Sequence, residues 1–483
     1  MKKLMVIPLV AAGMVTLVGC SKTPVKEAAK NDAINLANLD TAVAPGTDFY
    51  QYACGGWMKN NPLKPEYARF GTFDQLRDNN QEQIRTLIEG LSETPGQEGS
   101  VGQKIGMLFA MGMDSVKLNE DGYAPIKDQL AEINKLGTKD ELTKMVATLH
   151  KEGMAPFFAL YVGADEKNSS MNIVQLYQAG LGMGDRDYYL LEDESSQKMR
   201  EAYKNYITRL FTLIGSSPEQ ADAAVNAIMK IERGIAEVSF SREDLRDSQK
   251  NYNKMSIEGF KAKNDLLNWD VYFESMGMMD IKYLDAKQLS FYEGLSALMK
   301  NTTLDEQKYY LTFNLLSSAA PYLSDPFVAA DFDFYGKTMS GRQEQQPRWK
   351  RALSTVNGAL SEAVGQMYVA KYFPASSKEK MLKMVGDLQK ALGDRISSLE
   401  WMSDATKAKA QEKLAAFIVK IGYPDKWKDY TTLKIDPAKS YWENIVEANK
   451  WYTADNIAEL GKPVAADYAD KDPIFLGILK GVV

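Results

Sequence analysis

Apolar residues recur at helical spacing through most of this chain, and this periodicity constrains the fold more than any other feature. In the segment 217–238, Ser217 precedes Pro218, a pair typical of a helix N-terminus. The apolar residues that then fall on one helical face are Ala224, Ile228, Ile231, Ile235 and Val238. The pattern predicts an amphipathic helix that buries this face.

Two later segments have the same character. Segment 376–402 carries an apolar stripe made of Met381, Val385, Leu388, Leu392, Ile396 and Leu399. The helix predicted after it, in 404–424, is expected to stop at Gly422, with Pro424 behind it. Strand-like runs are few, and the best, 156–165, is expected to form a hairpin with 169–180. The predicted fold class is therefore mainly α, with a minor β-hairpin element.

The N-terminus reads as an export signal. Lys2 and Lys3 precede an apolar run over 4–18, which ends at Gly19 and Cys20. The ending "LVGC" resembles a bacterial lipoprotein signal, in which Cys20 becomes the lipidated first residue. We therefore expect a signal peptide at 1–19 and a flexible tether at 20–42. The expected location is the bacterial cell envelope, with the protein exported, anchored to the membrane by the lipid on Cys20 and facing the periplasm.

Charge and cysteine content narrow the function classes. The formal charge of −6 provides no general basic surface, which argues against nucleic acid as a partner. Cys20 and Cys54 are the only cysteines, so lipidation of Cys20 leaves Cys54 without a disulfide partner. A reactive thiolate would need a basic neighbour such as histidine. We expect Cys54 to be a buried, inert thiol.

The sequence lacks the residues of several hydrolytic sites, whereas a glycosidase-type pair of carboxylates stays open because the 64 acidic residues offer many pairs and none stands out. An H-E-x-x-H zinc site requires two histidines, and this sequence has one, His150. His150 lies near a predicted helix end, where we expect it to be solvated. No phosphate-binding G-x-x-x-x-G-K-[ST] loop and no C-x-x-C pair occur. We predict no catalytic residue, no metal ligand and no cofactor in this chain.

Several motifs nevertheless carry a family resemblance. The segment "PGTDFYQYACGGWMKNNPLKPEYARFGTFDQLRDNN" resembles the N-terminal signature of the neprilysin/endothelin-converting-enzyme family of zinc metallopeptidases, in a bacterial oligoendopeptidase-like form. Further matching pieces follow in the family's order, at 182–190, 341–353, 372–382, 399–414 and 421–430. The resemblance runs from about residue 45 to residue 464.

The resemblance implies a fold and a domain organisation. Family members build two largely helical lobes around a cavity that admits oligopeptides, and one lobe holds a single zinc ion. The family's N-A-[YF], H-E-x-x-H and E-N-x-A-D motifs all lie C-terminal to the part that this sequence matches. We therefore expect 43–440 to be the helical N-terminal (cap) domain. Residues 441–483 are expected to be a truncated beginning of the peptidase domain, with an off-family tail from about 465.

Arg69 and Arg77 are the candidate site residues. They match two family arginines that reach into the cavity and bind the C-terminal carboxylate or the backbone carbonyls of a peptide. A guanidinium suits this task because it pairs bidentately with carboxylates and keeps its charge. The alternative is that both are surface arginines paired with Asp74 and Asp78. The resemblance favours the cavity role.

The missing lobe also implies lost packing. In the family, the early segment and the region from about 441 pack on the catalytic lobe. We therefore expect Phe49, Tyr50, Tyr52 and Trp57 to lose burial partners, and the ends 45–65 and 441–483 to be poorly ordered.

Three functional hypotheses remain open. The chain is the cap lobe of a zinc metalloendopeptidase for oligopeptides and is inactive alone; or it is a non-catalytic peptide-binding lipoprotein; or it is one half of a split enzyme that a separately encoded catalytic chain completes.

Overall fold

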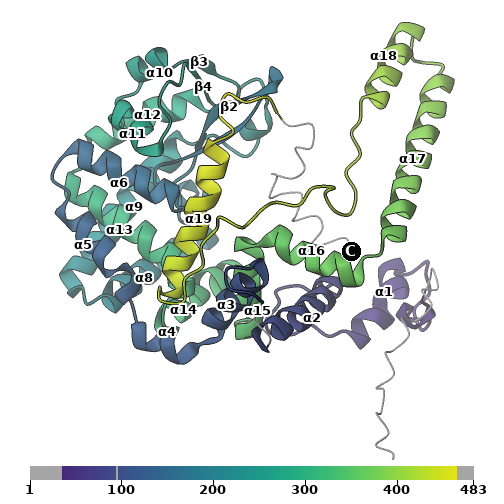
Figure 1. Ribbon diagram of the computed structural model, residues 1–483, viewed down its shortest axis with the longest axis horizontal. Helices are drawn as coiled ribbons and strands as arrows, with labels where there is room; N and C mark the ends of the chain where they lie inside the picture. The colour runs from purple at the N-terminus through teal and green to yellow at the C-terminus, as the bar shows by residue number, and fades with distance from the viewer. Residues whose placement is uncertain (1–34, 94–95, 465–483) are drawn as a thin grey trace, which may run out of the picture. The chain divides into compact units, whose positions relative to one another are not determined.

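The computed structural model describes residues 35–93 and 96–464, and the chain divides into two compact units, 1–62 and 63–483 (Figure 1). The expected signal peptide, most of the tether, the lipidation site Cys20 and the off-family tail lie outside the described residues. No helix among the described residues is long and apolar enough to cross a membrane.

The described part of the first unit holds a short 3₁₀ helix, η1 (Leu36–Asn38), and helix α1 (Phe49–Asn60). Two glycines let these elements approach closely. An added Cβ on Gly55 would lie 2.7 Å from Cβ of Asp40, and one on Gly56 would lie 2.3 Å from the carbonyl oxygen of Ala37. Within this unit Phe49 and Tyr50 are exposed, as expected, whereas Tyr52 and Trp57 are partly buried.

The second unit is mainly helical, which confirms the predicted fold class. Its first half contains α2 (Thr72–Glu93), α3 (Val101–Met113), α4 (Ser115–Asp121), η2 (Ala124–Ile126), α5 (Lys127–Lys135), α6 (Lys139–Lys151), β1 (Phe158–Asp165), β2 (Asn168–Gln178), α7 (Asp187–Leu190), α8 (Glu194–Leu213), α9 (Pro218–Val238), η3 (Asp244–Arg246) and β3 (Lys254–Ser256). Its second half contains α10 (Ile257–Lys263), α11 (Trp269–Met276), β4 (Tyr283–Ala286), α12 (Leu289–Lys300), α13 (Leu304–Ala319), η4 (Ala320–Tyr322), α14 (Asp325–Asp331), the π-helix η5 (Phe332–Met339), α15 (Arg348–Ala359), α16 (Ser361–Tyr372), α17 (Ala375–Ser398), α18 (Asp404–Ala415) and α19 (Tyr441–Ile457).

Helix α9 forms as its sequence predicts. Ser217 accepts a hydrogen bond from the backbone N–H of Gln220, whose side chain bonds back to Ser217, and Pro218 is the first helical residue. The predicted stripe faces the core: Ala224, Ile228, Ile231 and Ile235 are fully buried and Val238 is partly buried. This face packs on α8, α12 and α13.

The predicted hairpin is present and belongs to a larger sheet. β1 and β2 pair antiparallel, with Val162 opposite Val174. β4 then pairs parallel to β2, and β3 pairs antiparallel to β4, which gives the order β1-β2-β4-β3. Asn456 of α19 covers the edge of β1, because its side chain exchanges two 2.8 Å hydrogen bonds with the backbone of Val162.

The expectation of a loosely packed region from 441 is wrong for α19. Tyr441, Trp442, Ile445 and Val446 are buried. Helix α19 packs on α3, α6, α15 and β1, and Tyr322 contacts the rings of Tyr441 and Trp442. This helix therefore finds its burial partners within the present chain.

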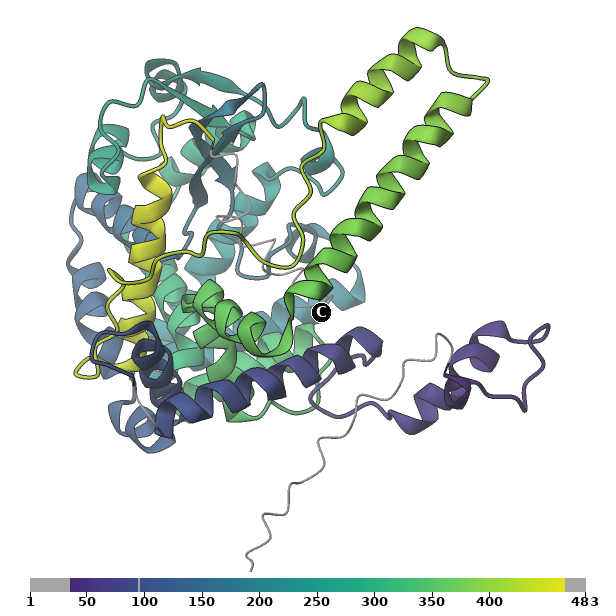
Figure 2. The ribbon, with the colours of Figure 1, turned by 45° about the vertical axis from the view of Figure 1, so that its right-hand side comes forward.

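The stripe predicted in 376–402 forms a helix, α17, but does not face a core. Within the described residues neither α17 nor α18 contains a buried residue, and Leu388 and Leu392 are 63% and 49% exposed. The two helices lie side by side (Figure 2). The predicted end of α18 at Gly422 is also wrong, because the helix stops at Ala415 and Ile418 lies exposed beyond it.

Candidate functional site

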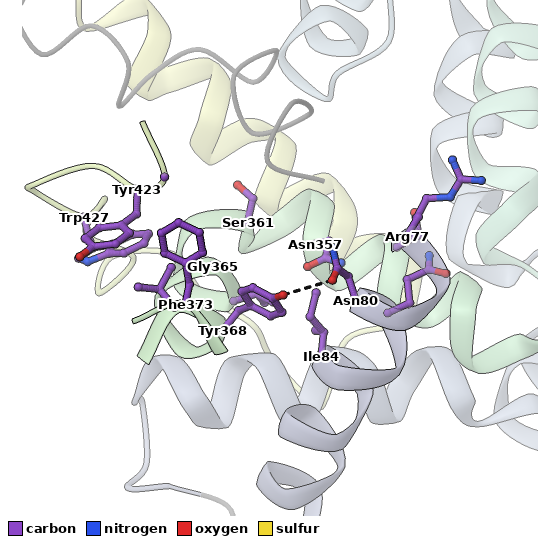
Figure 3. Close-up of a pocket in the computed structure, with 15 residues that line it drawn as sticks. Arg77, Asn80, Ile84, Asn357, Ser361, Gly365, Tyr368, Phe373, Tyr423 and Trp427 are labelled. Carbon is purple, nitrogen blue, oxygen red and sulfur yellow. Dashed lines mark hydrogen bonds between the residues drawn. The ribbon is translucent and has the colours of Figure 1, made fainter. Parts of the chain in front are cut away.

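A groove of about 250 Å³ lies between α2, α15, α16 and the segment 422–427 of the second unit. Its walls are mostly apolar, with a few polar groups. The lining residues are Arg77, Asn80, Gln81, Ile84, Ser354, Asn357, Ser361, Val364, Gly365, Tyr368, Val369, Phe373, Gly422, Tyr423 and Trp427. Figure 3 shows Arg77 at one end of the groove and Phe373, Tyr423 and Trp427 at the other.

Helix α2 presents one face to the groove. Arg77, Asn80, Gln81 and Ile84 follow the spacing i, i+3, i+4 and i+7, which places them on the same side of an α-helix. These four residues therefore line the groove in a row along the helix axis, and the guanidinium of Arg77 points away from the aromatic residues at the other end (Figure 3).

Arg77 is held in place by Asp74. Its Nη2 donates to Oδ1 of Asp74 at 2.5 Å, while the other carboxylate oxygen accepts the backbone N–H of Gly71 at 2.9 Å. The Arg77 side chain remains 45% exposed. A guanidinium has five N–H donors, and one of them serves Asp74, so donors remain for an anionic or carbonyl ligand.

The next residue on α2, Asp78, faces away from the groove lining and joins α2 to α15. It accepts hydrogen bonds from Tyr67 and, at 2.6 Å, from Nζ of Lys350. Burial alone would raise the pKa of the Asp78 carboxyl, but the bonds from Lys350 and Tyr67 outweigh it and lower this pKa. Of the two carboxylates considered for the arginines, Asp74 pairs with Arg77, and Asp78 pairs with Lys350 and Lys64.

Arg69 is exposed in the segment before α2 and does not line the groove. The structure therefore brings only one of the two predicted arginines to the groove. The role of Arg69 stays a prediction.

The wall opposite α2 is aromatic. The hydroxyl of Tyr368 lies 3.2 Å from Oδ1 of Asn80 and 3.1 Å from Oε1 of Gln83, to which it donates, so α16 is joined to α2. At the far end the rings of Tyr423 and Trp427 are stacked, with centroids 6.0 Å apart, and the ring of Phe373 stands edge-on to Tyr423. Sequence reasoning did not assign these residues to a site, although Phe373, Tyr423 and Trp427 lie within the family-like segments 372–382 and 421–430.

His150 is not solvated, contrary to expectation. It is buried, and its Nε2–H donates to the carbonyl of Pro156 at 3.1 Å, so Nδ1 accepts the hydroxyl of Tyr272 at 2.6 Å. Burial lowers the pKa of the imidazole to about 4, although the bond to Pro156 opposes this shift. Phe158, eight residues further along the chain, and Tyr272, which is 122 residues away in the sequence, enclose the ring.

The described residues do not fit the zinc ion that the family resemblance implies. Both ring nitrogens of His150 are already hydrogen-bonded within the protein. No group of three or more His, Cys, Asp or Glu side chains in the described ranges is arranged to hold a metal. Cys54 was expected to be buried, but it is only partly buried. We therefore derive no chemical step through zinc from these residues.

The buried acid Glu232 was not singled out from the sequence. It accepts hydrogen bonds from the hydroxyls of Tyr189 and Tyr203, at 2.6 and 3.0 Å, and from the backbone N–H of Gly182 at 3.3 Å. Burial raises the pKa of Glu232 to about 7, although these bonds oppose the shift. Tyr189 and Gly182 belong to the family-like segment 182–190, which therefore surrounds a buried acid in the core.

Comparisons with known proteins support the family resemblance and the fold. Residues 45–424 match Peptidase family M13. Endothelin-converting enzyme 1 of Mus musculus is 30% identical over 450 residues, which cover 88% of this chain and 58% of that protein. Neprilysin-11 of Caenorhabditis elegans is 27% identical over 466 residues, covering 90% of this chain and 54% of that protein.

Among solved structures, the Mycobacterium tuberculosis zinc metalloprotease Zmp1 in complex with inhibitor matches with a TM-score of 0.84 and 29% identity. The match covers 90% of this chain and 66% of that chain. The chain thus spans less than two thirds of the length of each of these relatives. On the family match and the fold together, this chain belongs to peptidase family M13 and is related to zinc metallopeptidases.

Proposed function

We propose that this chain binds oligopeptides in the groove beside Arg77, as the non-catalytic cap lobe of an M13-type zinc metalloendopeptidase. The single observation that supports this most is the position of Arg77 at one end of a mostly apolar groove. An apolar groove with few, well-placed polar groups is typical of ligand sites. A permanently charged, exposed guanidinium suits a peptide carboxylate or a row of backbone carbonyls.

Arg69 is proposed as a second contact to the same peptide. It is exposed and lies eight residues before Arg77 in the sequence. This role rests on the family resemblance, and the two arginines are to be tested separately.

The chain alone is proposed not to hydrolyse peptides. It has one histidine, so it cannot build the H-E-x-x-H motif within its 483 residues, and that histidine is buried and hydrogen-bonded. Peptidase family M13 acts on peptides, and this chain would contribute binding rather than chemistry.

An exported lipoprotein anchored through Cys20 is part of the same proposal. The basic and apolar start of the sequence and its "LVGC" ending support it. Peptides in the periplasm would then be the available ligands. Radiolabelled palmitate that is incorporated into the protein, but not into Cys20→Ser, would test the anchor.

The experiment that tests the proposed function measures binding and cleavage on one sample. The purified chain is titrated into a fluorescently labelled oligopeptide with zinc present, anisotropy reports binding, and mass spectrometry reports cleavage. Binding without cleavage is expected. Cleavage by the pure chain would contradict the non-catalytic assignment, and a lack of binding to every free-acid oligopeptide would contradict the peptide-binding role.

The incompletely covered apolar stripe of α17 favours a second candidate function. Leu388 and Leu392 are largely exposed, and α17 has no buried residue. Contiguous apolar surface of this kind often marks a protein contact. In this alternative the chain is one half of a split peptidase, and a separately encoded catalytic chain covers α17. Peptide hydrolysis that appears only when a second purified chain is added would favour it.

A further inference from the structure

The groove has two chemically different ends. Arg77 supplies a positive charge at one end. The other end, which we call the aromatic end, consists of Phe373, Tyr423 and Trp427 (Figure 3). The charged end accounts for a terminal carboxylate, but it leaves the aromatic end without an assigned ligand group.

We propose that the aromatic end is a side-chain subsite. It takes one large apolar residue of a bound oligopeptide, placed three or four residues before the C-terminal carboxylate. This inference rests on the proposed function, in which Arg77 binds that carboxylate. It adds a preference for peptide sequence that the binding of a carboxylate does not require.

The length of the groove sets the position of this residue. Arg77 and Ile84 are seven residues apart on α2, which corresponds to about 10 Å along a helix that rises about 1.5 Å per residue. An extended peptide advances about 3.3 Å per residue, so about three residues span this length. The aromatic end lies beyond Ile84 and Tyr368 as seen from Arg77 (Figure 3).

The rings at the aromatic end are held by their neighbours. Tyr423 and Trp427 stack with an interplanar angle of 11°, and Phe373 meets Tyr423 at 90°. Nζ of Lys378 lies 4.3 Å from the ring centroid of Tyr423 and is itself fixed by Asp425 at 2.9 Å. Fixed aromatic walls favour a large apolar or aromatic side chain, which gains both buried area and ring contacts.

The charge distribution favours a peptide over a second copy of this chain. Arg77 is the only charged residue among those that line the groove. A free C-terminal carboxylate complements this single cation, and every oligopeptide with an unblocked end carries one.

Gly365 allows the subsite to be blocked without removing any contact. It lines the groove on α16, and an added Cβ would lie 3.6 Å from Cζ3 of Trp427, an ordinary contact distance. Gly365→Leu therefore puts a side chain beside the aromatic end, and it replaces a helical glycine with a better helix former. Gly386→Leu is the matched control, because Gly386 lies on α17 with no atom near an added Cβ.

The experiment uses free-acid octapeptides of alanine and serine with one phenylalanine moved along the chain, and their C-terminal amides. For the wild-type protein, we expect the peptide that has phenylalanine three or four residues before its last residue to bind more tightly than the peptide without phenylalanine. The expected difference in affinity is roughly tenfold or more. Gly365→Leu should remove this advantage and keep the preference for acid over amide. Gly386→Leu should behave as wild type.

The outcomes separate this inference from the proposed function. Preference for the free acid with equal binding at every phenylalanine position would overturn the subsite and leave the carboxylate site standing. Binding of no peptide would overturn both. A dimer in sedimentation that Gly365→Leu disrupts would assign the aromatic end to a second copy and would also overturn the subsite. Melting temperatures of both variants establish that they are folded.

Discussion

Nζ of Lys350 on α15 lies 2.6 Å from Oδ1 of Asp78 on α2, and both side chains are largely buried. Lys350 also donates to the hydroxyl of Tyr67 at 2.9 Å, and that hydroxyl donates to Asp78. Asp78 follows Arg77 directly in the sequence. The ion pair therefore fixes the part of α2 that presents Arg77 to the groove.

Loss of one partner of this pair should destabilise the protein. Asp78→Ala leaves the Lys350 ammonium buried without its counter-charge, at a cost on the order of 2–3 kcal/mol in the free energy of unfolding. The double variant with Lys350→Met should cost less than the sum of the two single variants. Urea unfolding of the four proteins measures this coupling, and additive single effects would contradict it.

The contribution of the Asp78–Lys350 pair to the stability of the protein should depend on pH. The pKa of Asp78 is lowered in the folded state, so the unfolded chain binds more protons below about pH 4. The stabilisation is present above that pH and is lost as the pH falls through the folded pKa. The stability difference between wild type and Asp78→Asn should therefore shrink below about pH 4. An unchanged difference from pH 7 down to about pH 3 would show that Asp78 is not paired as described.

His150 should stay neutral in the folded protein well below the ordinary histidine range. Its pKa is lowered to about 4 by burial, and it is the only histidine in the sequence. An untagged protein labelled at histidine therefore gives one histidine side-chain signal in an NMR spectrum. We expect no titration of its chemical shift between about pH 8 and pH 5. A midpoint near the ordinary value of about 6.5 would contradict the buried position.

His150 also makes the folded state less stable in acid. The folded pKa lies below the unfolded one, so the unfolded state binds more protons, and stability falls as the pH drops from about 6.5 to 4. The loss is on the order of 3 kcal/mol by about pH 4. His150→Gln should lack this loss, as measured by urea unfolding across that range.

Glu232 should act in the opposite sense over an overlapping range. Burial raises its pKa to about 7, so the folded state binds the extra proton, and stability falls as the pH rises from about 4.5 through 7. In the wild-type protein, His150 makes the free energy of unfolding rise with pH and Glu232 makes it fall. These two effects partly cancel between about pH 4.5 and 6.5. In the Glu232→Gln variant only the contribution of His150 remains. The melting temperature of this variant should therefore rise with pH in this range. A pH profile identical to that of wild type would contradict the raised pKa.

The apolar stripe of α17 should contribute little to the stability of this chain. Leu388→Ala removes a largely exposed side chain, so the free energy of unfolding should change by less than about 0.5 kcal/mol. Ile228→Ala in α9 is the matched comparison. It removes a fully buried side chain and should cost about 2–5 kcal/mol. A loss above about 1 kcal/mol for Leu388→Ala would show that the α17 face is packed.

Helices α9 and α17 show that the sequence pattern predicts helix formation but not burial. Both have an apolar stripe at helical spacing, and both form helices, because this periodicity reflects local geometry. The stripe of α9 is buried, whereas in α17 no residue is buried and Leu388 and Leu392 of its stripe are exposed. Burial depends on whether another element lies opposite, and a pattern within one segment carries no information about that.

The same limit applies to the sheet and to the candidate site. The hairpin of β1 and β2 is local and was predicted, whereas β4 joins it across more than a hundred residues, with Val174 opposite Leu284. Arg77 was singled out through a family-like motif. Its groove partners come from α15, α16 and the segment 422–427, which only the folded chain brings together. His150 was placed correctly near a helix end, but its burial depends in part on Tyr272, which is 122 residues away in the sequence.

The most direct test of Arg77 as the carboxylate contact compares the binding of one oligopeptide as its free acid and as its C-terminal amide. Affinities are measured for wild type, for Arg77→Ala and for Arg85→Ala. Arg85→Ala removes the same charge from α2 but outside the groove lining. We predict that amidation weakens binding to wild type and to Arg85→Ala by roughly tenfold or more, and leaves binding to Arg77→Ala unchanged. An equal amide effect in all three proteins would contradict the assignment of Arg77 as the carboxylate contact.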